Sequence, residues 1–270
     1  MPKTRCADID VVWDVAGPID APPVLMINGL GAARAGWSLQ VEALGRRYRV
    51  FSYDNRDVGE TGTGSNPRSY GIDRFADDAA NLVEELEIGP IHVIGASMGG
   101  AIAQELALRR PDLTRSVQIV CSWARTDHWL ADLFGQWKAI FAEMGPLAFA
   151  RDSWLWVFTH RWYRDPDHLD TLIAATASYP FPQTAAMFGR QAEAAIGFDA
   201  LDRIGHIAAP VHIVAGKEDI LTPPRFSQEL QEAIPGSILT LLPDVGHGMF
   251  WETPERFNSA LLGFLDQHQG

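Results

Sequence analysis

The feature that most constrains the fold of this 270-residue chain is a series of short runs that are apolar at nearly every position. Strands with one buried face alternate apolar and polar residues, so continuous apolar runs predict strands that are buried on both faces. The runs are Val24 to Ile27, Arg49 to Tyr53, Ile91 to Gly95, Val117 to Cys121, Val211 to Ala215 and Ile238 to Leu242. Segments with apolar residues at helical spacing, such as Asp73 to Leu86 and Met98 to Arg110, lie between several of them. This alternation predicts an α/β fold with right-handed crossovers and a mostly parallel sheet.

Two regions depart from this alternation. The opening segment Ile9 to Val15 is expected to form an antiparallel edge hairpin strand. Between about Trp123 and Ala209 the chain has helix-like patterns and no convincing strand. We therefore expect an α/β core formed by residues 1–122 and 210–270, with a helical segment inserted at residues 123–209. The inserted segment is rich in tryptophan; such residues usually form a core, but Trp123, Trp129 and Trp154 are our candidates for lining a substrate pocket.

Charge and hydropathy limit the classes of partner. The formal net charge is -12, and no stretch rich in Lys or Arg compensates for it locally, so nucleic acid and anionic membrane surfaces are not expected as partners. No apolar run approaches the roughly 20 residues needed to span a bilayer, and the N-terminus lacks the apolar segment of a signal peptide. We expect a cytoplasmic protein whose partner is a small molecule; the sequence leaves open whether it forms a homodimer.

The run Gly95-Ala96-Ser97-Met98-Gly99 fits the pattern G-x-S-x-G, which by itself is a weak signal. Here, however, it follows a buried-strand run and begins a helix-forming run, which is the strand-turn-helix setting of a nucleophile elbow. Glycines on both sides of Ser97 allow a sharp turn in which a larger side chain would collide with the neighbouring strand and helix. The alternative is an ordinary serine at a helix N-terminus. We interpret Ser97 as the candidate nucleophile.

Serine reacts only when a base accepts its proton, so a histidine and a carboxylate that orients it are required. Among the eight histidines, His247 lies in a loop after the last strand-like run, between two glycines that would let the imidazole reach across a cleft. Asp219 lies in the loop after Val211 to Ala215, at the same edge of the sheet. Glu218 and Asp127 are the rival candidates for the acid. The chain order Ser97, Asp219, His247 is the order of the α/β-hydrolase arrangement.

The oxyanion that forms when serine attacks a carbonyl group needs two fixed hydrogen-bond donors. One expected donor is the backbone N–H of Met98. The other is the N–H of Leu30, in the loop Asn28-Gly29-Leu30-Gly31 that follows the first buried strand. Asn28 and Gly29 are expected to contact substrate. The alternative is that this loop is only a turn, because Asn-Gly favours turns whatever the function.

These motifs together resemble the α/β-hydrolase-fold serine hydrolases over nearly the whole chain. The loop Asn28 to Gly31, followed by Trp37, is similar to the oxyanion loop of 3-oxoadipate enol-lactonases, and that family's second oxyanion donor maps onto Leu30. The stretch Arg56 to Thr61 resembles a loop of aclacinomycin methylesterases. The resemblance implies a mostly parallel eight-stranded sheet with a helical cap after the sixth strand. Two positions depart from the common patterns: Asn28 replaces a histidine and Asp57 replaces a glycine, which weakens assignment to a subfamily.

The expected function is hydrolysis of a carboxylic ester or lactone of an apolar or aromatic small molecule through an acyl-enzyme. Ser97 attacks, His247 transfers the proton and Asp219 orients His247; no metal or organic cofactor is required. Three alternatives use the same triad for hydrolysis of a carbon–carbon bond, for perhydrolysis, or for a lyase or cyclase step. A further alternative is a non-catalytic ligand receptor on the same fold, because fold alone does not determine function.

Overall fold

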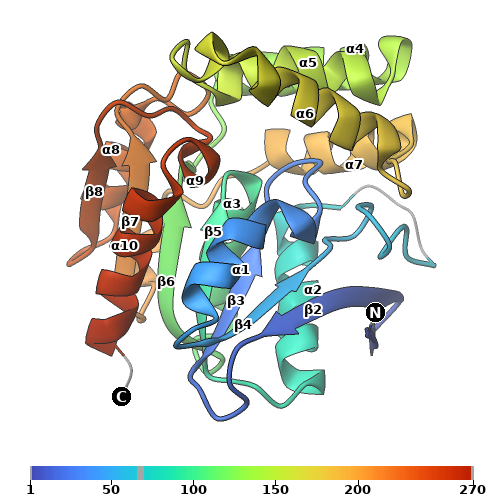
Figure 1. Cartoon of the computed structure of the whole chain (residues 1–270). Coiled ribbons are helices and arrows are strands. Elements are labelled where there is room, and N and C mark those ends of the chain that lie inside the picture. Colours follow the sequence, from blue (N-terminus) through green and yellow to red (C-terminus); the bar gives the residue numbers. More distant parts are fainter. Residues whose placement is uncertain (1, 66–69, 269–270) are drawn as a thin grey trace.

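An eight-stranded sheet runs through the molecule in the order β1-β2-β4-β3-β5-β6-β7-β8 (Figure 1). The structure, a computed structural model, describes residues 2–65 and 70–268. The strands are β1 (Lys3–Cys6), β2 (Ile9–Ala16), β3 (Pro23–Ile27), β4 (Arg49–Tyr53), β5 (Ile91–Ala96), β6 (Thr114–Val120), β7 (Val211–Gly216) and β8 (Ile238–Leu242). All pairs from β4 to β8 are parallel, whereas β1 pairs with β2 and β2 with β4 in antiparallel fashion. The predicted mostly parallel sheet is confirmed.

The expectation of an edge strand at the N-terminus was wrong in one respect. Ile9–Ala16 is antiparallel as predicted, but it is covered by the four-residue strand β1, which forms the edge. The β1 sequence Lys-Thr-Arg-Cys has little apolar character, and only Cys6 in it is buried. An apolar pattern is therefore missing from a strand that places a single side chain, that of Cys6, in the core.

Helices cover both faces of the sheet. On one face, α2 (Ile72–Glu85), α3 (Met98–Arg109) and α8 (Pro224–Ala233) bury residues such as Phe75, Ile102 and Phe226 in the larger core cluster. On the other face, α1 (Ser38–Leu44), α9 (Met249–Glu252) and α10 (Pro254–Leu265) pack around Leu44 and Phe257. The described residues also form the short 3-10 helices η1 (Arg34–Trp37), η2 (Trp162–Arg164), η3 (Ile204–His206) and η4 (Asp266–His268). Two apolar faces explain why β5 and β7 are buried at every residue.

Four helices lie between β6 and β7, and we call them the helical insertion. They are α4 (His128–Met144), α5 (Pro146–Val157), α6 (Pro166–Ser178) and α7 (Ala185–Ile196). In Figure 1 they form a separate layer above the ends of the central strands. The chain leaves and re-enters the core at one place, because Arg125 and Asp199 form an antiparallel bridge and the N–H of Ala200 donates to the carbonyl of Ala124 (2.9 Å).

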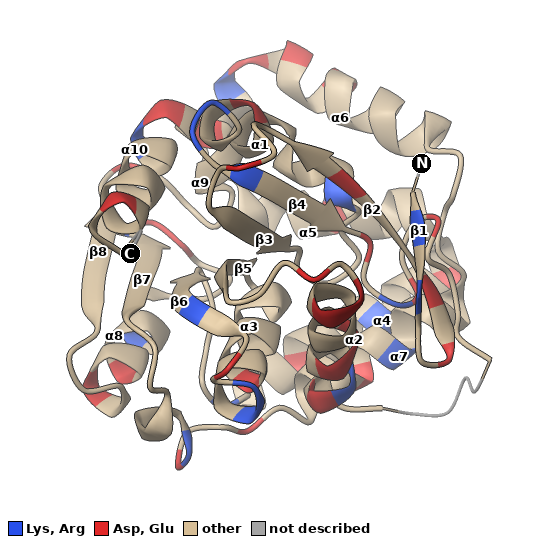
Figure 2. Ribbon diagram, turned by 90° about the horizontal axis from the view of Figure 1, so that it is seen from below, with Lys and Arg blue, Asp and Glu red and all other residues tan. Residues whose placement is uncertain are grey.

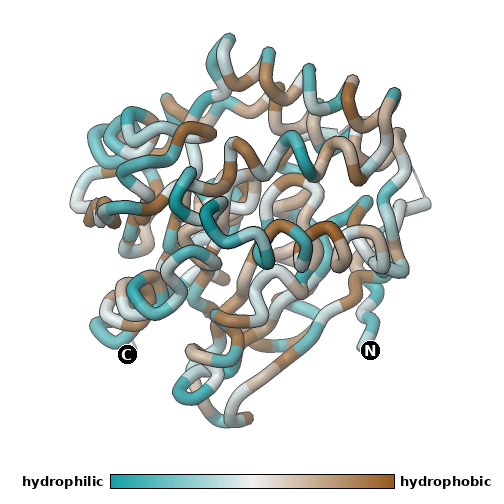
Figure 3. Tube along the Cα trace, turned by 45° about the horizontal axis from the view of Figure 1, so that its top comes forward, coloured by the Kyte–Doolittle hydropathy of each residue, from teal (hydrophilic) through white to brown (hydrophobic). Residues whose placement is uncertain are grey.

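The insertion has an aromatic interior that is continuous with the larger core cluster. Phe188 of α7 stacks on Phe141 of α4, with ring centroids 4.5 Å apart, and Phe149 of α5 contacts both rings. By contrast, α6 contains no fully buried residue. Hydrophobic and hydrophilic residues alternate along the insertion helices, as expected for helices with one apolar face (Figure 3).

The surface carries charges of both signs. Figure 2 shows Lys and Arg distributed over several elements, while α2 is rich in Asp and Glu. In the part of the chain that the structure describes, no helix combines the length and the apolar character needed to cross a membrane.

Candidate active site

Ser97 occupies the turn between β5 and α3 in a backbone conformation that non-glycine residues rarely adopt. Its φ is 56° and its ψ is -121°. The peptide groups on both sides are held: the N–H of Ser97 donates to the carbonyl of Val120 (2.9 Å), and the carbonyl of Ser97 accepts from the N–H of Gly100 and the hydroxyl of Ser122 (2.8 Å each). Strain of this kind persists only where the surroundings enforce it, and it is concentrated at functional sites.

The glycines around Ser97 are required by close backbone approach. A Cβ at Gly95 would lie 2.1 Å from the carbonyl oxygen of Gly99, and one at Gly99 would lie 2.2 Å from the carbonyl oxygen of Ile27. A Cβ at Gly100 would lie 2.5 Å from the Cβ of Ser122. These distances are well inside van der Waals contact, so the G-x-S-x-G pattern here follows from packing of the helix against the sheet.

The Ser97 hydroxyl is not used to cap α3. Ser97 is the N-cap residue, but its side chain makes no capping hydrogen bond. Met98, the first residue of α3, presents an N–H with no acceptor among the described residues, as is usual at a helix N-terminus. Ser97 is partly exposed, so its hydroxyl and the positive end of the helix dipole are accessible to a ligand.

Asp219 and His247 come together at the same edge of the sheet. Asp219 follows β7, His247 follows β8, and the His247 Nδ1 lies 2.9 Å from the Asp219 Oδ2. The other carboxylate oxygen accepts from the N–H groups of Leu221 (2.9 Å) and Thr222 (2.8 Å). These bonds fix the carboxylate, and its bond to Nδ1 leaves the His247 Nε2 on the opposite side of the ring.

The two rival acids are engaged elsewhere. Glu218 forms an ion pair with Arg161 of the insertion, with both side chains partly exposed. Asp127 is the N-cap of α4, where its carboxylate accepts from the N–H of Leu130 (2.9 Å) and pairs with Arg225. Of the three carboxylates considered from the sequence, only Asp219 contacts His247.

The surroundings of His247 determine its pKa. Burial alone lowers the pKa of an imidazole, but Cys121 and the Asp219 carboxylate beside His247 raise its pKa above the ordinary value. An acidic partner therefore makes His247 a stronger base than an isolated buried histidine. Two buried histidines on strands contrast with it: burial lowers the pKa of His92 and that of His212 to about 4, so both are neutral core residues.

Sequence reasoning missed Thr222 at this site. Its hydroxyl lies within 3.1 Å of three groups: the Asp219 Oδ2 (2.9 Å), the His247 Nδ1 (3.1 Å) and the carbonyl of Cys121 (3.0 Å). Cys121 follows β6, the strand between those that carry Ser97 and Asp219. Thr222 thus ties the acid and base to the end of the central strand. Thr222 could have been predicted from the sequence, because a hydroxyl residue three positions after Asp219 in the same loop can bind the Asp219 carboxylate.

The loop after β3 lies directly against Ser97. A Cβ at Gly29 would be 3.0 Å from the Ser97 Cβ and 3.5 Å from its Oγ. The side chain of Asn28 is turned into the loop, where its amide donates to the carbonyl of Ala33 (2.8 Å), and Asn55 holds the Asn28 carbonyl (3.0 Å). The N–H of Leu30 has no acceptor within residues 2–65 and 70–268. The loop can therefore offer one free amide next to the serine.

The three candidate tryptophans have different environments. Trp123 is fully buried, packs against Phe134 and donates its indole N–H to Thr126 (2.7 Å), so in this structure it belongs to the core. Trp154 is nearly buried in a small cluster with Phe158. Trp129 is 39% exposed and contacts Trp156 edge to face. Among the described residues, no group of three or more His, Cys, Asp or Glu side chains is arranged to hold a metal ion.

Comparison with known proteins identifies similar chains over the full length. Residues 22–254 match the model of the alpha/beta hydrolase fold family. A relative from Azorhizobium caulinodans, named carbamate hydrolase RutD, is 33% identical over 267 residues, which cover 99% of each chain. A relative from Mycobacterium tuberculosis, named non-heme bromoperoxidase BpoC, is 32% identical over 263 residues, which cover 95% of this chain and 98% of the relative. The enol-lactonase structure from Burkholderia xenovorans superimposes with a TM-score of 0.89 at 24% identity, over 98% of this chain and all of that one.

Proposed function

The chain belongs to the alpha/beta hydrolase fold family, and we propose that it hydrolyses a carboxylic ester or lactone of an apolar or aromatic small molecule by a Ser-His-Asp mechanism. The observation that carries the proposal is the strained Ser97 turn at the sheet edge where Asp219 binds His247. A residue held at positive φ, with a hydroxyl that makes no capping bond, is suited to attack a substrate rather than to stabilise a helix.

In the proposed reaction, the Ser97 Oγ adds to the substrate carbonyl while the His247 Nε2 accepts the serine proton. The N–H groups of Leu30 and Met98 bind the oxyanion, and donors of this kind are each worth about 3 kcal/mol of barrier. The intermediate then collapses, and His247 gives the proton to the departing alcohol oxygen. Water activated by His247 attacks the acyl-enzyme and releases the acid.

The class of substrate is proposed from the helical insertion. Its helices carry aromatic side chains toward the core, and partly exposed aromatic groups such as Trp129 and Trp156 offer apolar surface. Pockets for small molecules are lined mainly by apolar and aromatic side chains. A small apolar or aromatic ester or lactone fits this chemistry better than an anionic polymer, which the net charge of -12 would repel.

The test combines covalent labelling with turnover. A fluorophosphonate should label the wild-type protein once, on Ser97, and the protein should hydrolyse a short-chain p-nitrophenyl ester. Ser97→Ala should remove both signals with no loss of folded structure by circular dichroism. Ser178→Ala, at an exposed serine of α6, is the matched control and should retain both. Turnover by Ser97→Ala equal to that of the wild type would overturn the mechanism.

The names of the relatives favour a second candidate function, in which the same residues act on a carbamate instead of an ester, or transfer the acyl group to hydrogen peroxide instead of water. A carbamate also presents a carbonyl to Ser97, and it would form a carbamoyl-enzyme. Hydrogen peroxide in place of water would convert the acyl-enzyme to a peracid. Assay of aryl carbamates beside aryl esters and lactones, each with and without hydrogen peroxide, distinguishes these reactions by their products.

A further inference from the structure

A glutamine of the insertion reaches the loop that lies against Ser97. Gln191 is on α7, 160 residues from Gly31, and it is fully buried. Its Oε1 accepts from the N–H of Gly31 (3.0 Å), and its Nε2 donates to the carbonyl of Arg56 (2.7 Å). A side-chain amide has one accepting and one donating end, so these two partners fix which way the Gln191 amide faces.

The bond to Gly31 constrains the peptide units of the loop. Gly31 has φ +71°, a conformation that suits glycine. The N–H of Ala32 donates to the carbonyl of Gly29 (3.3 Å), so the amides of residues 31 and 32 are both engaged. In the described part of the chain, the preceding amide, that of Leu30, is left without an acceptor. The amides of Gly31 and Ala32 are therefore held, while that of Leu30 can bind a ligand.

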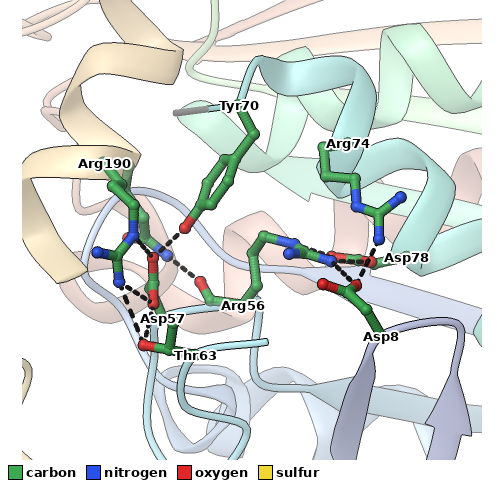
Figure 4. Close-up of polar contacts among 9 residues, drawn as sticks. Asp8, Arg56, Asp57, Thr63, Tyr70, Arg74, Asp78 and Arg190 are labelled. Atoms are coloured by element: carbon green, nitrogen blue, oxygen red, sulfur yellow. Dashed lines mark hydrogen bonds and ion pairs between the residues drawn. The ribbon is translucent and has the colours of Figure 1, made fainter. Parts of the chain in front are cut away.

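The other partner of Gln191 is itself rigid. The Arg56 side chain is buried and binds Asp78 through Nε (2.5 Å) and Nη2 (2.6 Å), and it also contacts Asp8 (Figure 4). These ion pairs restrain Arg56, whose carbonyl binds the Gln191 amide. Gln191 therefore connects the Gly31 N–H to a restrained residue. A flexible partner would transmit no such constraint.

Helix α7 is also held to the core independently of Gln191. Arg190 binds both carboxylate oxygens of Asp57 (2.7 Å each), and Thr63 and Tyr70 donate to the same carboxylate (Figure 4). Gln183, just before α7, donates to the carbonyl of Asp57 (2.6 Å). Arg190 does not contact the loop 28–31. A substitution of Arg190 therefore weakens the attachment of α7 to the core without removing a contact to this loop.

We propose that Gln191 is a positioning residue that orients the loop 28–31, so that the Leu30 N–H points to the oxyanion formed at Ser97. This inference rests on the proposed function. The insertion then sets the geometry of one oxyanion donor in addition to covering the site. Gln191 touches neither substrate nor Ser97 and acts through Gly31.

The test measures turnover per active site. Gln191→Met keeps the side-chain length and removes the hydrogen bonds to Gly31 and Arg56 together with the long one from Gln183 (3.4 Å), while Gln191→Glu keeps an acceptor for Gly31. With sites counted by fluorophosphonate labelling, Gln191→Met should lower kcat for an aryl ester about 10- to 100-fold with KM within about 3-fold, which is less than direct loss of an oxyanion donor. Affinity for an aryl trifluoromethyl ketone, whose adduct with Ser97 carries an oxyanion, should fall by a similar factor. For Gln191→Glu, both kcat and the affinity for the ketone should lie between those of the wild type and those of Gln191→Met.

Arg190→Lys is the matched control, because it weakens the bond to Asp57 and retains a cation there. It should lower Tm but leave kcat per labelled site within about 3-fold of the wild type. Amide exchange of Gly31, measured by NMR, should accelerate in Gln191→Met and stay slow in Arg190→Lys, a readout that needs no activity.

The outcomes separate the two proposals. If Gln191→Met and Arg190→Lys lower kcat per labelled site equally, Gln191 only attaches helix α7 to the core and the inference is overturned. The inference is also overturned if Gln191→Met leaves both kcat and the affinity for the ketone unchanged. If the wild-type protein is not labelled at Ser97, the proposed function fails, and the inference fails with it.

Discussion

Two parts of the molecule hold the loops of the candidate site, and they contribute different kinds of contact. At the sheet edge, side chains bind side chains: Asp219, His247 and Thr222 form one group at the ends of β6, β7 and β8. At the loop 28–31 and the loop after β8, the insertion instead contacts backbone N–H groups. Gln191 holds the Gly31 N–H, and the carbonyl of Val157, at the end of α5, accepts from the N–H of Gly248 next to His247 (2.8 Å).

This difference suggests a division of roles. The sheet edge supplies groups that gain or lose protons, whereas the insertion holds the loop that carries the Leu30 amide and the loop that carries His247. Substitutions at the sheet edge should therefore change the chemistry in a protein of ordinary stability. Substitutions in the aromatic interior of the insertion, away from Gln191, should change stability, with little effect on the chemistry of the molecules that remain folded.

The largest expected effect is that of Asp219→Asn. Without the carboxylate, His247 loses the partner that fixes its tautomer, and kcat/KM for an aryl ester should fall about 10⁴-fold. Glu218→Gln is the matched control, since Glu218 is the neighbouring residue and pairs only with Arg161 and not with His247. Steady-state kinetics of both variants tests the comparison, and a loss below 10-fold in Asp219→Asn would contradict the role of the sheet edge.

The next effect concerns the interior of the insertion. Phe141→Ala removes a ring that stacks on Phe188 and should lower the free energy of unfolding by about 3–5 kcal/mol. Met144→Ala on the same helix, at a residue 69% exposed, should change it by less than about 0.5 kcal/mol. Urea unfolding measures both. The division of roles would be wrong if Phe141→Ala lowered kcat per labelled site by more than its loss of folded protein explains.

The pH dependence of kcat/KM sharpens the account of the sheet edge. Protonated His247 cannot accept the Ser97 proton, so activity should fall as the pH falls through its pKa. Because Cys121 and Asp219 raise that pKa against the effect of burial, the rising limb should have its midpoint above 6.5. The rate of fluorophosphonate labelling should follow the same limb. A midpoint below 6.5 would mean that burial outweighs the carboxylate.

The smallest effect is expected on α6, where no residue is fully buried. Leu172→Ala removes a half-buried side chain and should cost about 1 kcal/mol or less. The same urea experiment applies. A loss as large as that of Phe141→Ala would show that α6 is an integral part of the aromatic interior, and the insertion could no longer be divided into a packed and a loosely packed part.

Much of the fold followed from local pattern. Runs such as Ile91 to Gly95 are apolar on both faces, and the observed strand differs from the predicted one by a single residue. The end of α3 was predicted within one residue because Pro111 follows it. The strand β1 was missed because a short edge strand needs no apolar pattern.

The candidate site divides in a similar way. Ser97, Asp219 and His247 could be chosen from the sequence because each follows a strand, and parallel strands end at one edge of the sheet. Gln191 could not, because its partner Gly31 is 160 residues away and a glutamine in a helix carries no sign of its contact. The burial of Trp123 agrees with the usual place of a tryptophan in a core, but the sequence did not show which of the three candidate tryptophans would be the buried one.

The two ends of the insertion lie side by side, joined by the bridge between Arg125 and Asp199. A segment that departs and returns at one point can be replaced by a longer, shorter or unrelated one without moving the strands that carry Ser97, Asp219 and His247. Such a junction makes this part of the chain a natural unit for exchange between relatives, in evolution and in chimeric proteins. A transplanted unit would bring its own apolar lining to the recipient, but it would need an equivalent of Gln191 to fit the recipient's loop.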